Sequence, residues 1–127
     1  MRGAATYLRM LTRLTGAIQI VLGVLFWSGY ALSLISIHML VGLTLVLGLW
    51  ALSWLAAASG ASLGSVVLAV AWGVVVPVLG LTQTQLLPGS DHWVIQAVHL
   101  LVGLGAIGMA ELMAGDVLGP GASAAGA

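Results

Sequence analysis

Four long apolar stretches, separated by short polar breaks, constrain this chain more than any other feature. They cover approximately residues 14–32, 34–58, 63–82 and 91–113. A helix needs roughly 20 mainly apolar residues to cross the hydrocarbon core of a bilayer, so each stretch is long enough to cross once. The sequence therefore predicts an all-α integral membrane protein with four transmembrane helices.

The scarcity of charge agrees with this prediction. Only 5% of the 127 residues are charged, whereas a soluble domain carries about 25%. A chain this short exposes much of its surface, so it cannot hide this many apolar side chains from water. The absence of cysteine excludes disulfides, thiolate metal sites and thiol catalysis. The formal net charge of zero argues against nucleic acid, so the expected partners are the lipid bilayer and a larger membrane complex or homo-oligomer.

The breaks between the stretches are short, which favours an up-down-up-down four-helix bundle. Gly60 lies in the second break, where a helix C-cap and a new helix start are expected. Ser90 is the predicted N-cap of the last helix. We expect a four-helix transmembrane domain over residues 1–118 and a low-complexity, disordered tail over residues 119–127.

The arginines predict the orientation of the helices. Arg2, Arg9 and Arg13 all precede the first apolar stretch, and the chain has no other basic residue apart from histidine. The positive-inside rule therefore puts the N-terminus in the cytoplasm, and four crossings return the C-terminus to the same side. Glu111, near the end of the last stretch, is expected to meet Arg9 or Arg13 at this face.

An internal repeat is the most informative pattern. Residues 38–43 (HMLVGL) recur as residues 99–104 (HLLVGL), and residues 21–24 (VLGV) recur as residues 78–81 (VLGL). The two halves of the domain are therefore interpreted as two copies of one helical hairpin. Because each copy crosses the membrane twice, the copies should be related by a pseudo-two-fold axis along the membrane normal.

The repeated histidines are the candidate cofactor site. His38 and His99 should lie at similar heights near the outer surface, on helices two and four, which face each other diagonally in a simple bundle. Two opposed imidazoles in a bundle core predict axial ligation of one b-type haem. Gly42 and Gly103, one turn below each metal ligand, would leave room for the macrocycle. Gln96 or backbone carbonyls are the expected hydrogen-bond acceptors for the other ring nitrogens.

Several alternatives stay open. The histidines could have a packing role, or bind another metal or a quinone, or transfer protons. A non-haem metal is the weaker alternative, because only the carboxylate of Asp91 accompanies the pair, and His92 is expected to lie at the membrane interface. No nucleotide loop, nucleophile–base pair or carboxylate dyad occurs, so no catalytic residue and no catalytic activity of the chain's own is predicted.

The favoured function is a small b-type haem protein, either an electron carrier or a haem-holding subunit of a larger complex. The alternatives are a non-catalytic accessory or assembly protein and a small-solute carrier.

Taken whole, the chain resembles small four-span bacterial membrane proteins. The likeness covers nearly all of the chain and rests on residues 38–43, 75–83 and 92–103. It implies the four-helix fold and a multi-pass protein of a prokaryotic cytoplasmic (inner) membrane, but no particular activity. The paired histidines are also similar in principle to those of four-helix b-type cytochromes. That resemblance implies a single haem here, because the chain has only one such pair.

Overall fold

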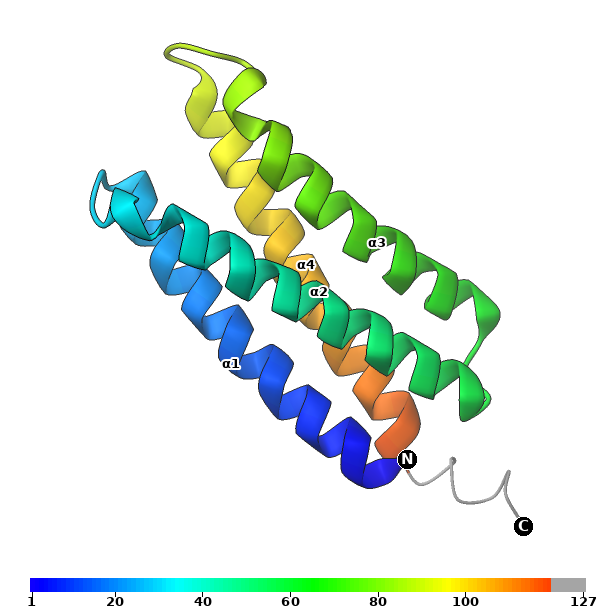
Figure 1. The fold of residues 1–127 in the computed structure, drawn as a ribbon. Coiled ribbons are helices and arrows are strands. Elements are labelled where there is room, and N and C mark those ends of the chain that lie inside the picture. The colour runs from blue at the N-terminus through cyan, green and yellow to red at the C-terminus, as the bar shows by residue number, and fades with distance from the viewer. Residues whose placement is uncertain (120–127) are drawn as a thin grey trace.

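The computed structural model describes residues 1–119, and within them it is entirely helical. The long helices are α1 (Arg2–Trp27), α2 (Ile35–Ala58), α3 (Leu63–Thr82) and α4 (His92–Leu118), and the short 3-10 helices are η1 (Leu32–Leu34) and η2 (Gln83–Gln85) (Figure 1). Each long helix is long and apolar enough to cross a membrane. The all-helical prediction with four candidate spans is therefore confirmed. The predicted tail, apart from Gly119, lies outside the described residues.

Helices α2 and α4 form the centre of the bundle. Each of them contacts all three other long helices, whereas α1 and α3 do not contact each other within the described residues. Exchanging the α1–α2 pair with the α3–α4 pair leaves this pattern of neighbours unchanged. That is what two repeated hairpins would give, but duplication of the hairpin stays a prediction.

Two helices end in the same backbone motif. After α1, the N–H of Gly29 bonds to the carbonyl of Phe26 and the N–H of Tyr30 to that of Leu25. The same pair of bonds follows α2, and in both motifs the glycine has a positive φ, +80° at Gly29 and +87° at Gly60. A glycine adopts this conformation without the steric penalty of a Cβ, and the left-handed residue ends the helix. The helix end predicted in the break at residues 59–62 is confirmed, with Ser59 as the C-cap and Gly60 directly after it.

The predicted boundaries of the first and last helices differ from the structure, and α4 continues to Leu118, past the predicted end at residue 113. α1 begins at Arg2 and ends at Trp27, because helical hydrogen bonding extends well beyond the apolar stretch and Gly29 stops it early. α4 has Asp91 as its N-cap, without a side-chain hydrogen bond, so the predicted N-cap at Ser90 is wrong. Backbone bonds shape this start instead: the N–H of His92 bonds to the carbonyl of Gly89, and that of Val94 to the carbonyl of Asp91.

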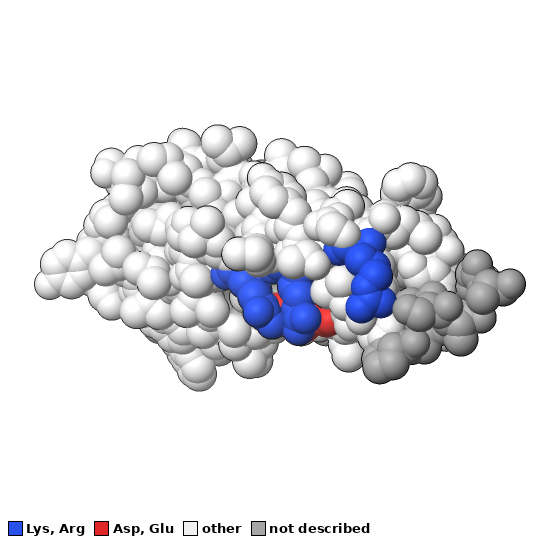
Figure 2. All heavy atoms as spheres, turned by 90° about the horizontal axis from the view of Figure 1, so that it is seen from below, with Lys and Arg blue, Asp and Glu red and all other residues white. Residues whose placement is uncertain are grey.

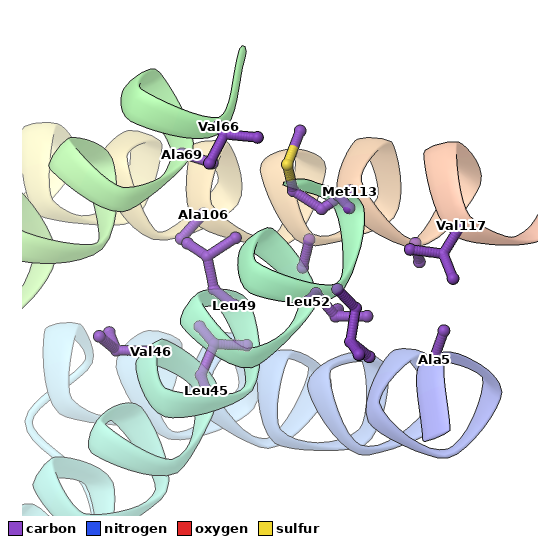
Figure 3. Packing of buried hydrophobic residues seen from close by; sticks show 14 of the residues in the cluster. Ala5, Leu45, Val46, Leu49, Leu52, Val66, Ala69, Ala106, Met113 and Val117 are labelled. Carbon is purple, nitrogen blue, oxygen red and sulfur yellow. The ribbon is translucent and has the colours of Figure 1, made fainter. Parts of the chain in front are cut away.

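The fully buried core lies toward one end of the bundle, and all four helices contribute to it. The largest side chains with almost no exposed surface include Leu49 and Leu52 on α2 and Met113 on α4 (Figure 3). Ala5 on α1 and Val117 on α4 lie at the end of the cluster. The other end has almost no such residue. α2 has none before Leu45 and α4 none before Ala106.

Two tryptophans donate hydrogen bonds to the backbone of a neighbouring helix, and one of them packs closely against a glycine. The indole N–H of Trp50 on α2 donates to the carbonyl of Val70 on α3, at 3.2 Å. The indole N–H of Trp72 on α3 donates to the carbonyl of Val102 on α4, at 2.9 Å. A Cβ at Gly105 would lie only 2.7–2.8 Å from the Trp72 ring. The glycine is therefore required by this close approach.

Candidate functional site

The repeated histidines lie next to each other. The ring centroids of His38 on α2 and His99 on α4 are 6.4 Å apart, and the ring planes are inclined by 53°. The prediction that the two imidazoles converge at one height, from the two central helices, is confirmed. The physical reason is that α2 and α4 touch directly, so residues at matching depths on their facing sides meet.

The other two helices complete the surroundings of the pair. From α1, the amide nitrogen of Gln19 donates to the backbone carbonyl of His38 at 2.9 Å. Also from α1, the ring of Phe26 meets the His38 ring edge-on, with centroids 5.2 Å apart and planes at 69°. From α3, Gly80 faces His99, and a Cβ at Gly80 would lie 3.2 Å from the His99 Cε1 atom. We call these residues and the two histidines the histidine cluster.

The two glycines of the repeated motif have different surroundings. A Cβ built on Gly42 would overlap the amide of Gln19, whereas one built on Gly103 would meet nothing within 4 Å. The space beside Gly42 is therefore used by Gln19, and the space beside Gly103 is open. That either glycine makes room for a macrocycle stays a prediction.

Three polar atoms of the histidine cluster are buried without a hydrogen-bond partner. They are Nδ1 of His38, Nδ1 of His99 and Oε1 of Gln19. No other buried side-chain nitrogen or oxygen in residues 1–119 lacks a partner. Buried polar atoms are nearly always hydrogen-bonded in proteins, so three exceptions in one place single out this cluster as the candidate site.

The cluster offers two metal ligands from the protein. Within the described part of the chain, no group of three or more histidine, cysteine, aspartate or glutamate side chains could hold a metal ion.

His92 is separate from the cluster, at the start of α4, where its Nδ1 lies 3.2 Å from the carbonyl of Leu86. An apolar hollow of about 250 Å³ lined by Ala17, Ile18, Val21 and Leu22 belongs to α1 and contains neither histidine of the pair.

A second group of polar side chains joins α1 to α4. Glu111 accepts hydrogen bonds from Arg9, at 2.6 and 2.9 Å, and from Arg13, at 2.6 and 2.8 Å. Arg2 donates to the carbonyl of Leu118 at 2.7 Å. Figure 2 shows the arginines on one face, with an acidic side chain between them. The predicted meeting of Glu111 with the arginines is confirmed, and both arginines take part.

The sequence places Gln19 on one helical stripe with Thr12, Gly16 and Gly23, which is expected to face the other helices, but it assigns neither Gln19 nor Phe26 a role at the histidines. The signal for Gln19 was its polarity, because it is the only glutamine in α1 and follows the last arginine by six residues. Phe26 left no signal, since an aromatic residue near the end of an apolar helix is usually an interfacial anchor. Only the packing of α1 against α2 brings both to His38.

Comparison with protein-family models, with curated proteins and with solved structures finds no match for this chain. The histidine cluster itself is therefore the basis for assigning a function.

Proposed function

We propose that the four long helices cross a prokaryotic cytoplasmic membrane in an up-down-up-down bundle. Large apolar side chains on their outer faces support this, with exposed fractions of 64–77% at Tyr7, Trp54, Leu63 and Leu101. Such a surface needs lipid around it. The three arginines lie in the first half of α1, so the positive-inside rule puts this end and both termini in the cytoplasm.

The chain has no cysteine, so single cysteines can report this topology. We expect a membrane-impermeant maleimide to label Ser33→Cys and Ser90→Cys in intact cells. Ser59→Cys should be labelled only after the cells are opened. The opposite pattern would invert the orientation, and labelling of all three in intact cells would contradict the membrane topology.

We propose further that the chain is a small b-type haem protein that carries electrons or holds haem for a larger complex, and that His38 and His99 would hold the haem. The observation that carries this proposal is the spacing of the two rings. Two imidazoles that bind one metal ion from opposing helices, at a metal–nitrogen distance like that of zinc sites (about 2.0–2.1 Å), have ring centres about 6 Å apart. The 6.4 Å between the ring centroids of His38 and His99 is close to that spacing.

The number of ligands also favours haem over a bare metal ion. Zinc in proteins takes three or four protein ligands, and the described residues offer two at this place. In haem the macrocycle supplies four nitrogens, so two histidines complete the coordination of the iron. When bound, haem would supply one-electron redox chemistry through its iron.

The residues of the chain would then hold and orient the haem. His38 and His99 would bind the iron from α2 and α4, and Phe26 would fix the plane of the His38 ring by its edge-on contact. No fully buried side chain lies on α2 before Leu45 or on α4 before Ala106. A flat group between the rings would therefore meet no fully buried side chain of α2 or α4.

The test is a visible absorption spectrum of protein purified in mild detergent, oxidised and then reduced with dithionite. We expect a sharp Soret band and resolved α and β bands on reduction. His38→Ala and His99→Ala should each lose most of the haem, and His92→Ala is the matched control that should keep it. Unchanged haem in both ligand variants, or a colourless wild type after haem supplementation, would refute the proposal and favour an accessory protein or a solute carrier.

A further inference from the structure

We infer that Gln19 is a positioning residue for the histidine pair: its amide oxygen accepts the hydrogen bond of the His38 Nδ1–H and so leaves Nε2 of that ring free to bind a metal. The inference deepens the proposed haem function and rests on it for the identity of the ligand. The hydrogen bond itself can be tested without haem.

The orientation of the Gln19 amide is the first step. Its nitrogen lies 2.9 Å from the backbone carbonyl of His38. A carbonyl oxygen only accepts hydrogen bonds, so the atom facing it must be the NH₂ group of Gln19. The amide oxygen, Oε1, therefore faces away from this carbonyl, and it is buried without a donor.

The donors available to this oxygen are the second step. Within residues 1–119, the only other buried side-chain atoms without a partner are Nδ1 of His38 and Nδ1 of His99. An imidazole nitrogen that carries a proton is a donor, so the cluster contains one acceptor and two potential donors. We take His38 as the donor, because the same amide already binds its backbone carbonyl. Both atoms lack a partner in the structure, so the inferred bond requires a rotation of the ring or a bridging water molecule.

The consequence for ligation is the third step. The hydrogen bond made by one imidazole nitrogen decides which nitrogen of the ring carries the proton. Metal-binding histidines almost always donate their second N–H to such an acceptor, and loss of the acceptor typically lowers metal affinity about 10–100-fold. An acceptor at Nδ1 of His38 selects the tautomer whose Nε2 has a free lone pair.

Gly42 supports this role for Gln19. A side chain at Gly42 would overlap the Gln19 amide, so the glycine one turn after His38 provides the space in which the amide reaches the histidine. The equivalent Gly103 after His99 has no side chain near it. The two histidines are thus inequivalent, and His38 is the one that α1 orients. The side chain of Gln96, which the sequence offers as an acceptor alongside backbone carbonyls, makes no hydrogen bond in the described structure.

The experiment uses the apoprotein labelled with ¹⁵N-histidine, in detergent, where two-bond ¹H–¹⁵N spectra report the protonated nitrogen of each ring. In the wild type we expect His38 as the Nδ1–H tautomer. Gln19→Met keeps the length of the side chain but removes both polar groups, and it should move His38 toward the Nε2–H tautomer. Gln19→Glu keeps the acceptor and should restore the wild-type signal. His92 is the internal control, and Thr15→Val, one turn earlier on α1, is the matched variant.

A second measurement uses the haem-loaded protein. Gln19→Met should bind haem about 10–100-fold more weakly and raise its midpoint potential, because the His38 ligand becomes less basic, whereas Gln19→Glu should do neither. If Gln19→Met does not fold, Gln19→Ala makes the same prediction.

Unchanged His38 signals in a folded Gln19→Met or Gln19→Ala protein would overturn the inference, even if haem binds. Failure of Gln19→Glu to restore the wild-type His38 signals would also overturn the inference. The role of Gln19 would then depend on the hydrogen bond that its NH₂ group donates to the His38 carbonyl. A wild type that binds no haem but shows the expected tautomer changes would refute the haem proposal and support the role of Gln19.

Discussion

The two ends of the bundle are built differently. We call the end that holds Arg9, Arg13 and Glu111 the arginine end, and the opposite end, around His38 and His99, the histidine end. At the arginine end the apolar side chains of the core are fully buried, and both oxygens of Glu111 are hydrogen-bonded. At the histidine end almost no side chain is fully buried, and three buried polar atoms lack partners.

We interpret the arginine end as a scaffold and the histidine end as the proposed site. Close packing and satisfied polar groups stabilise a single arrangement of helices, which the arginine end provides. Proteins depart from these rules mainly at functional sites, where stability is given up for binding. In Figure 1 the α1–α2 and α3–α4 connections lie apart at the histidine end, which agrees with an end that is less tightly packed.

The strongest test of this contrast removes the unpartnered polar atoms. The triple variant Gln19→Leu/His38→Leu/His99→Leu, which removes all three unpartnered atoms together, should bind no haem, yet its apoprotein should be more stable than wild type by about 2 kcal/mol, because a buried polar group without a partner costs about 1–3 kcal/mol. The measurement is the midpoint of thermal unfolding in detergent without haem. A lower midpoint than wild type would mean that these three side chains support the fold.

A pair of glycines on α4 tests where close packing begins. Gly105→Ala would push a methyl group into the Trp72 ring, 2.7–2.8 Å away, whereas Gly103→Ala meets nothing within 4 Å. Overpacking costs about 1–3 kcal/mol, and alanine in place of a helical glycine returns roughly 1 kcal/mol. We expect Gly105→Ala to lower the unfolding midpoint and Gly103→Ala to keep or raise it. Equal shifts in the two variants would contradict the packing difference.

The smallest expected effect comes from the arginine end. Glu111→Gln removes the charge that both arginines share and should lower the free energy of unfolding by on the order of 1 kcal/mol, since the cluster is partly exposed. The visible spectrum of the haem-loaded protein should not change, because the histidine end does not use this cluster. Asp116→Asn is the matched control, an exposed acidic residue of the same helix. A spectral change in Glu111→Gln alone would show that the two ends are coupled.

Much of the fold could be predicted because it depends on local properties of the chain. Apolar length predicted the four helices, Gly60 predicted a helix end, and the positions of Arg9, Arg13 and Glu111 predicted their contact at one end. The start of α4 was predicted wrongly at Ser90, because backbone bonds of the preceding turn, not a side-chain cap, form that start. Gly29 went unnoticed inside an apolar stretch, where its positive φ has no sequence signature beyond the glycine itself.

The sequence by itself determined that the chain forms four long apolar helices, and that it carries one repeated histidine at matching places in its two halves. Helical periodicity and hydropathy are properties of neighbouring residues, so they can be read without knowing the fold. Only the tertiary structure decided which helix would face each histidine. Gln19 reaches His38, and Phe26 contacts its ring, because α1 packs against α2 at the level of Gly42. That contact joins residues of separate helices, and its geometry depends on the rotation of each helix, which no local pattern specifies.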